Sequence, residues 1–211
     1  MSPHRRACVE AAEVALDLAG SAEVRAAWDT ESACAGMSVG GLAHHLLAQS
    51  VTAARLLAAE PDGDPIPLLE HYERAAWVKS GPDDEVNVGI RTNSDERAAA
   101  GPDAVLAGGR EAIAALPGLL GGPRDPDVVR IPWQGWSLTT DDFLTTRLME
   151  IVVHSDDLAA SVGLPTPEFP ADAVTPVLAL LTGVAVRRHG QAALVRALSR
   201  PQRAPASVSA F

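Results

Sequence analysis

The sequence predicts an all-α protein, a four-helix bundle with a small C-terminal helical extension. Apolar residues make up 47% of the 211 residues and aromatic residues only 4%, so Ala, Leu and Val must fill the core. Ala and Leu favour helices. Four long segments repeat apolar residues at helical spacing, and short segments containing Gly and Pro separate them.

The first two long helices are expected at residues 5–19 and 39–60. Gly20 ends the first apolar repeat, and a short helix over residues 22–28 is expected to follow it. Ser38 stands directly before the second repeat, where its hydroxyl can cap the start of the helix.

The middle of the chain is expected to alternate helices with loops. A helix is predicted over residues 68–79, and a polar, irregular loop over residues 81–94. The third long helix is predicted over residues 103–116, with Pro117 ending it. Residues 128–136 are rich in β-branched side chains but contain a proline, which predicts extended chain rather than a paired strand.

The fourth long helix, over residues 140–162, has the clearest end signals. Thr139, with Asp142 three residues later, resembles a capping box, and Gly163 closes the C-terminal end. The chain is therefore expected to divide after this helix. Residues 1–165 would form the bundle, and residues 166–211 a helical extension packed on it.

Charge and hydropathy exclude two classes of partner. The formal net charge of −10 gives an acidic surface, which argues against binding to the phosphates of nucleic acids. The longest apolar run, residues 174–186, is shorter than a membrane span and contains Pro176 and Gly183, so no membrane partner is expected. Cys8 and Cys34 belong to no metal or redox motif, which predicts free thiols in a reducing compartment, the cytoplasm.

A polar stripe on the helix over residues 140–162 carries the candidate chemistry. It holds Arg147, Glu150, His154 and Asp157, beside the apolar core stripe of the same helix. Glu150 and His154 are four residues apart and share one face, so together they can bind one metal ion if a facing helix supplies a third ligand. A solvated face, with Arg147–Glu150 and His154–Asp157 ion pairs, would give the same pattern.

The third ligand is expected from the histidine pair His44-His45 on the helix over residues 39–60. Neighbouring residues point about 100° apart on a helix, so at most one of the pair can face the site. His45 lies near the direction of Leu56 and His44 near that of Arg55, which favours His45.

Two motifs resemble a known family. The run MSVGGLAHHLLAQ (37–49) resembles a degenerate W-T-V-x-x-x-x-A-H-L segment, with Met37 in place of the Trp. The run WQGWSLTTDDFLTTRLMEIVVHSDDLAASVG (133–163) matches a W-x-G…R-x-x-E-x-x-x-H-x-x-D-L-A-x-x-x-G signature. Over most of residues 5–165 the chain resembles the N-terminal bundle of mycothiol-dependent maleylpyruvate isomerases, within the DinB/YfiT-like metalloproteins.

The resemblance implies a site and an activity. The family's metal ligands fall on His45, Glu150 and His154, and zinc is the expected ion. Three protein ligands leave an open coordination position, as in catalytic zinc sites. The resemblance further implies that mycothiol binds there as a metal-bound thiolate and attacks an electrophilic small molecule. The product would be an S-conjugate or an isomer of the substrate, so the protein is expected to be a thiol transferase or isomerase.

Two further side chains on the stripe, Arg147 and Asp157, each allow two interpretations. Arg147 would bind a carboxylate of the substrate or cofactor, or pair with Glu150 or Asp142. Asp157 would accept the imidazole N–H of His154, as partners of metal-bound histidines do, or form a salt bridge elsewhere.

The roles of three residues outside the stripe also allow two interpretations. Trp133 and Trp136 would wall a cavity that binds the cofactor or substrate, or belong to the core. His71 would act as a general acid or base, or be an exposed helix histidine.

Two other functions fit the same ligands or the same fold. A metal-dependent hydrolase would use hydroxide at the open position. A non-catalytic bundle would bind a ligand in its cavity or dimerise through its surface. The expected partners are a small electrophile and a low-molecular-weight thiol, and the protein is expected to be a monomer or a homodimer.

Overall fold

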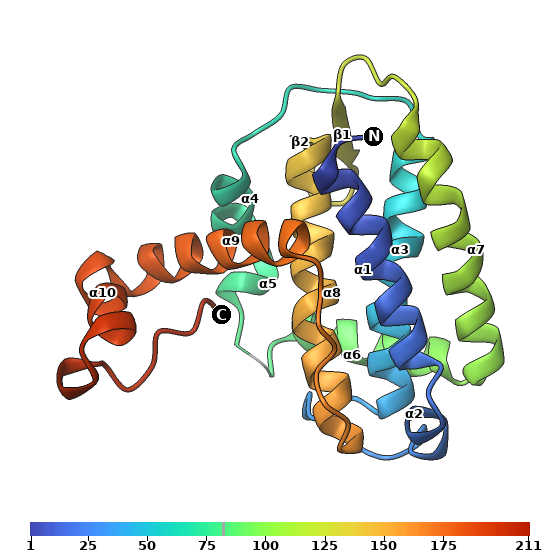
Figure 1. Ribbon diagram of the computed structural model, residues 1–211, viewed down its shortest axis with the longest axis horizontal. Coiled ribbons are helices and arrows are strands. Elements are labelled where there is room, and N and C mark those ends of the chain that lie inside the picture. The colour runs from blue at the N-terminus through green and yellow to red at the C-terminus, as the bar shows by residue number, and fades with distance from the viewer. Residues whose placement is uncertain (82) are drawn as a thin grey trace.

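The computed structural model describes residues 1–81 and 83–211, and within them the chain is mostly helical (Figure 1). The helices are α1 (Pro3–Ala19), α2 (Ala22–Ala26), α3 (Val39–Ala58), α4 (Leu68–Arg74), α5 (Ala76–Lys79), α6 (Glu85–Ala98), α7 (Pro102–Gly121), α8 (Thr140–Val162), α9 (Ala171–His189) and α10 (Gln191–Ser199), followed by a 3₁₀ turn at Pro201–Arg203. Two strands, β1 (Val128–Ile131) and β2 (Trp136–Thr139), form a hairpin. The prediction of an all-α protein with a DinB-like bundle is confirmed.

The bundle consists of α1, α3, α7 and α8, which run side by side in Figure 1. Helix α3 packs against α7 and α8, and α1 packs against the same two helices, so their apolar faces enclose one core. The predicted caps of α3 and α8 are present. Ser38 Oγ accepts from the N–H of Gly41 at 2.9 Å, and Thr139 Oγ1 accepts from the N–H of Asp142 at 3.1 Å.

The predicted loop over residues 81–94 is wrong for most of its length, because α6 begins at residue 85; residue 82 lies outside the described residues. The helix is polar, with few apolar residues to signal it, and it is held by contacts to α3. Asp95 Oδ1 accepts from both Oγ and N–H of Ser38, at 2.6 and 3.0 Å. A Cβ at Gly41 would lie 2.1 Å from the same oxygen, so the glycine permits this close packing.

Two predictions of helix bounds need correction. Helix α7 continues through Pro117 to Gly121, because Leu116 and Leu120 on either side of the proline are buried in the core. The proline removes one backbone donor near the end of the helix, where little of the helix remains to be disrupted. The helix predicted over residues 68–79 is interrupted at Ala75, whose backbone is extended.

Residues 128–136 were expected to be extended but unpaired, and this is wrong. Strands β1 and β2 pair antiparallel from Val128 opposite Thr139 to Ile131 opposite Trp136. The proline lies in the connecting turn and not in a strand, so it removes no ladder hydrogen bond. Gly135 takes a positive φ of 84° in that turn.

The C-terminal extension shares the core of the bundle. Helix α9 packs on α8 and α1, and its Val177 and Leu180 are buried in the same apolar cluster as the bundle residues. Beyond α10 the tail turns back toward α5, where the C-terminus lies in Figure 1. Its Phe211 contacts Tyr72 and Trp77. The domain boundary at residue 165 stays a prediction.

One helix of the bundle is long and apolar enough to cross a membrane by length and composition alone. It is α7, with a mean hydropathy of 1.2 over 18 residues, and not residues 174–186, which were the longest apolar run in the sequence analysis and were judged too short. Core helices of soluble proteins pass the same test, and α7 buries Leu106 and Ile113 against the other bundle helices.

Candidate metal centre

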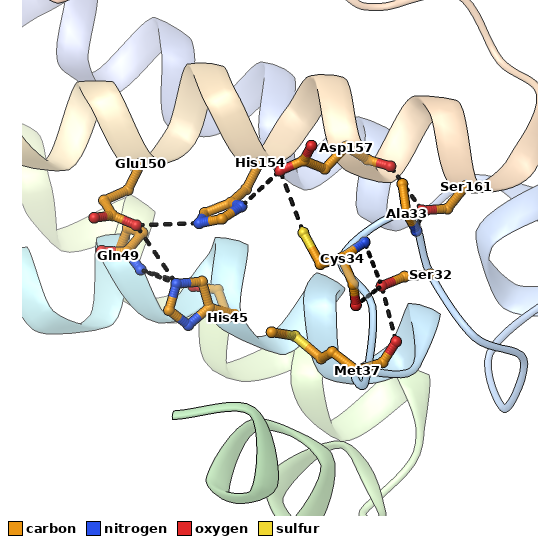
Figure 2. Close-up of polar contacts among 10 residues, drawn as sticks. All are labelled: Ser32, Ala33, Cys34, Met37, His45, Gln49, Glu150, His154, Asp157 and Ser161. Carbon is orange, nitrogen blue, oxygen red and sulfur yellow. Dashed lines mark hydrogen bonds and ion pairs between the residues drawn. The ribbon is translucent and has the colours of Figure 1, made fainter. Parts of the chain in front are cut away.

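Helices α3 and α8 bring the three predicted ligands together (Figure 2). Glu150 Oε2 lies 3.5 Å from His45 Nε2 and 3.2 Å from His154 Nε2. The two imidazole rings meet edge to face, with centroids 4.8 Å apart. One nitrogen from each histidine and one carboxylate oxygen lie within 4.8 Å of one another, a donor set suited to a divalent cation.

Of the two neighbouring histidines, His45 is the one that faces the candidate metal site. Its imidazole faces Glu150, and the turn of α3 carries His44 away from the carboxylate. His44 is half-buried elsewhere, and its Nδ1 has no hydrogen-bond partner within residues 1–81 and 83–211. Burial, followed by the nearby His45 and Arg97, lowers the pKa of His44.

The carboxyl group of Glu150 is held ionised by its surroundings. Burial opposes the charge, but hydrogen bonds from His154 and His45 outweigh burial and keep its pKa well below the usual range. The pKa of His154 is raised well above its ordinary value: burial acts against the charge, and Asp157, Cys34 and Glu150 overcome it. The site therefore concentrates negative charge around imidazoles, the environment that a cation prefers.

Asp157 contacts the other side of His154. Its Oδ2 lies 3.0 Å from His154 Nδ1, so the Nε2 atom is left to face Glu150. A carboxylate in this position fixes the tautomer and orientation of a metal-binding histidine. Burial, the largest single effect, would raise the pKa of Asp157, but the hydrogen bond and charge of His154 together with the hydrogen bond from Cys34 leave it lowered.

Two neighbours of the site were not anticipated from the sequence. Cys34 donates from Sγ to Asp157 Oδ2 at 3.4 Å, although it lies 123 residues earlier in the chain (Figure 2). Gln49, one turn after His45, donates to the His45 carbonyl at 3.0 Å and accepts from Arg147 at 2.6 Å. Helical spacing of four residues from His45 was the signal that could have identified Gln49.

Arg147 makes neither of its predicted ion pairs. Among the described residues its guanidinium bonds to Gln49 and to Thr146 Oγ1, and it lies over the ring of Phe143 at 5.7 Å. No acidic side chain in that part of the chain lies within ion-pair distance of it, while it lines the cavity beside Glu150. Its charge remains available to a ligand.

A cavity of about 840 Å³ opens next to the three donors. One side is formed by α3 and α8, with His45, Glu150, His154 and Arg147. The other side is formed by α4, α5, α6, the hairpin and the tail, and it is aromatic: His71, Tyr72, Trp77, Trp133 and Phe211. A space of this size accommodates a small molecule.

His71 is buried, not exposed, with only 4% of its surface accessible. Its Nδ1 accepts the indole N–H of Trp136 at 3.1 Å, and burial lowers its pKa to about 4. Trp136 does not line the cavity among the described residues but lies behind His71, so its predicted part in cofactor binding stays a prediction. Trp133 belongs to the cavity wall and not to the core, with 57% of its surface exposed.

Fold and site together define a DinB-like helical bundle with a candidate metal centre between two of its helices. Residues 9–159 match the family model described as mycothiol maleylpyruvate isomerase N-terminal domain. The chain belongs to this family, which confirms the resemblance predicted from its two motifs. No curated protein and no solved structure was found to match the chain. Family membership places the protein among mycothiol-related enzymes.

Proposed function

We propose that the protein is a metal-dependent thiol transferase or isomerase that uses mycothiol to attack an electrophilic small molecule. The observation that carries the proposal is the convergence of His45, Glu150 and His154 at the wall of a cavity large enough for substrates. Membership of the mycothiol maleylpyruvate isomerase family supports the thiol.

Zinc is the ion that this donor set fits best. Two imidazole nitrogens and one carboxylate oxygen are common ligands of catalytic zinc, in which a fourth position stays open to substrate. When bound, the ion would lower the pKa of a thiol that coordinates it. The protein holds the ion through His45, Glu150 and His154, while Asp157 keeps the ring of His154 in the required orientation.

Arg147 is proposed to bind an anionic group of the substrate or cofactor. Its guanidinium is held by Gln49 and Phe143 and forms no direct ion pair with an acidic side chain in the described part of the chain, although its charge acts on nearby Glu150. Two planar N–H groups of an arginine match a carboxylate well. We further infer a cytoplasmic location, because Cys8 and Cys34 are free thiols.

Metal content of purified variants tests the ligand assignment. We expect about one equivalent of divalent metal in the wild type, held by His45, Glu150 and His154, and almost none in His45→Ala or His154→Ala. His44→Ala is the matched control, because it removes the neighbouring imidazole that faces away from Glu150, and it should keep its metal. Unchanged metal content in His154→Ala would refute the assignment.

Dependence on added mycothiol tests the reaction. Electrophile consumption should require both the wild-type protein and mycothiol, and it should persist when Cys8 and Cys34 are both replaced by serine. Consumption that is equal with and without mycothiol would contradict the thiol-using reaction and favour metal-dependent hydrolysis.

A further inference from the structure

A second group of metal-binding side chains lies on the side of His154 that faces away from Glu150. It consists of Cys34, from the loop between α2 and α3, and of His154 and Asp157 on α8 (Figure 2). One donor atom from each residue lies within 4.8 Å of the other two, as in the first group, which is His45, Glu150 and His154. Thiolate, imidazole and carboxylate are the side-chain ligands from which zinc sites are built.

The spacing of the second group suits a single ion. Asp157 Oδ2 lies 3.0 Å from His154 Nδ1 and 3.4 Å from Cys34 Sγ. In the first group, Glu150 Oε2 lies 3.2 and 3.5 Å from its two imidazole nitrogens. Ligands of one tetrahedral zinc ion are about 3.4–3.6 Å apart, given metal–ligand distances of about 2.0–2.3 Å. Small side-chain movements would therefore complete the second site as readily as the first.

His154 belongs to both groups through its two ring nitrogens. Nε2 faces Glu150 at 3.2 Å, and Nδ1 faces Asp157 at 3.0 Å. The two nitrogens of an imidazole are distinct and point away from each other, so one ion cannot bind both of them. An ion bound by the second group therefore occupies a different position from an ion bound by the first.

The loop that carries Cys34 is held on α8 by contacts that do not involve the thiol. The hydroxyl of Ser161 accepts from the N–H of Ala33 at 2.8 Å and donates to the carbonyl of Asp157 at 2.6 Å (Figure 2). The hydroxyl of Ser32 accepts from the N–H of Cys34 at 3.2 Å. These contacts position the sulfur before an ion binds. Cys34 also lines the large cavity, which gives an ion a path of entry.

We propose that Cys34, His154 Nδ1 and Asp157 form a second metal position, which takes a thiophilic divalent ion such as Zn²⁺ or Cd²⁺ beside the first position. Thiolate is a soft ligand and the first group contains no sulfur, so the second group selects for thiophilic ions. The inference goes beyond the proposed function, because it requires neither mycothiol nor turnover.

The second ion takes the place of two protons. Cys34 donates its thiol proton to Asp157, and because a carboxylate only accepts, His154 Nδ1 also carries a proton directed at that group. The ion binds sulfur, nitrogen and oxygen, both protons pass to solvent, and the charge of the group is unchanged. The imidazole then bridges two ions. Because the first position fills without displacing a thiol proton, the second is weaker and fills only when ion is added to the purified protein.

Titration of the metal-free protein with Co²⁺ tests the proposal, because sulfur bound to Co²⁺ gives a strong charge-transfer band in the near ultraviolet. The first equivalent should bind without this band, since the first group contains no sulfur. The band should grow with the second equivalent and stop at about two ions per chain, one for each group. The absence of the band at every ratio would overturn the proposal, and so would a band that stops growing at about one ion per chain.

Cys34→Ser is the decisive variant, because it removes the sulfur and keeps the size of the side chain and the loop contacts. It should bind about one Co²⁺ per chain, through the first group, and show no band. Cys8→Ser is the matched control, because this other thiol is buried in the core and belongs to neither group. Its titration should match that of the wild type. A band that persists in Cys34→Ser would overturn the proposal.

His45→Ala separates this inference from the proposed function. The variant breaks the first group and leaves the second intact, so the band should appear with the first equivalent of Co²⁺, without the lag of the wild type. A missing band in this variant would overturn the proposal. Mycothiol-dependent turnover in a protein without the band would refute the second position alone. The band in a protein without such turnover would refute the proposed function alone.

Cadmium NMR is an independent measurement of the same position. A thiolate ligand moves the cadmium resonance far downfield of that from a site with only nitrogen and oxygen ligands. The wild type and Cys8→Ser should therefore give two resonances, and Cys34→Ser should lose the downfield one. A single resonance in the fully loaded wild type, or two in Cys34→Ser, would contradict the second position.

Discussion

The two sides of the cavity are built in different ways. On one side, α3 and α8 present single residues spaced by helical turns: His45 and Gln49 on one helix, Glu150 and His154 on the other. On the other side, short elements and the tail contribute aromatic residues from three separate parts of the chain: residues 71–77, residue 133 and residue 211. On the metal-facing side, helical spacing fixes the positions within each helix and the packing of α3 on α8 brings them together, whereas the aromatic side depends on contacts among short elements and the tail.

The family match covers residues 9–159, which include the three candidate ligands and most of the aromatic side. It leaves out Phe211, which packs on Tyr72 and Trp77. Because the three candidate ligands lie on α3 and α8 alone, we expect changes on the two sides to have separable effects. Those on α3 and α8 should alter metal binding, and those on the aromatic side should alter ligand binding or stability.

The largest effect is expected from Glu150→Gln, which keeps the shape of the side chain and removes its charge. Loss of a direct ligand should weaken metal affinity by more than the roughly 100-fold upper range seen for indirect partners. Competition with a chromophoric chelator measures the affinity. Asp142→Asn, on the same helix but outside the donor set, should bind metal as the wild type does, and wild-type affinity in Glu150→Gln would remove the carboxylate from the site.

His71 should make stability depend on pH. Its pKa is about 4 in the folded protein against an ordinary 6.5, so the unfolded chain binds the proton more readily. The neutral ring's contribution is complete above pH 6.5 and is lost as pH falls toward 4, a loss of about 3 kcal/mol. Urea unfolding at several pH values should show this decline in the wild type and a smaller one in His71→Gln; parallel profiles would contradict it.

Asp157→Asn should have an intermediate effect on the metal-facing side. The amide cannot accept the imidazole N–H as strongly as the carboxylate does, so metal affinity should fall by about 10- to 100-fold. Asp156→Asn is the matched control, because the neighbouring aspartate bonds to Thr166 instead. Equal affinities in the two variants would show that Asp157 does not support His154.

The smallest effect is expected from Phe211→Ala on the aromatic side. The ring is 37% exposed and contacts Tyr72 and Trp77, so its loss should lower the free energy of unfolding by about 1 kcal/mol. Metal content should not change. Metal loss in Phe211→Ala would show that the two sides of the cavity are coupled.

The same contrast explains what the sequence could predict. Helical periodicity placed Glu150 and His154 on one face, and the helical phase favoured His45 over His44, because all three positions follow from local geometry. The family resemblance then joined them into one site. The bundle helices and their caps were predictable for the same reason.

The contacts on the aromatic side of the cavity could not be predicted from helical periodicity. His71 is buried because Trp136, from the hairpin, and Tyr72 cover it, and nothing local to α4 signals that contact. Cys34 meets Asp157 only through the packing of a loop on α8. Helix α6 was missed because its contact with α3 runs through Asp95 and Ser38, a pairing that no periodicity encodes.

The tight contact at Gly41 lets α6, which forms part of the cavity wall, pack closely on α3. Asp95 fills the space that a Cβ at Gly41 would occupy, and this contact holds α6 against α3. Asn87 and Ile90, one to two turns earlier on α6, line the cavity. A methyl group at Gly41 would collide with Asp95 on α6 and also with Met37, whose side chain lines the cavity, so one or both would have to move. The size of ligand that the protein accepts could thus be tuned, in nature or by engineering, from a position that never meets the ligand.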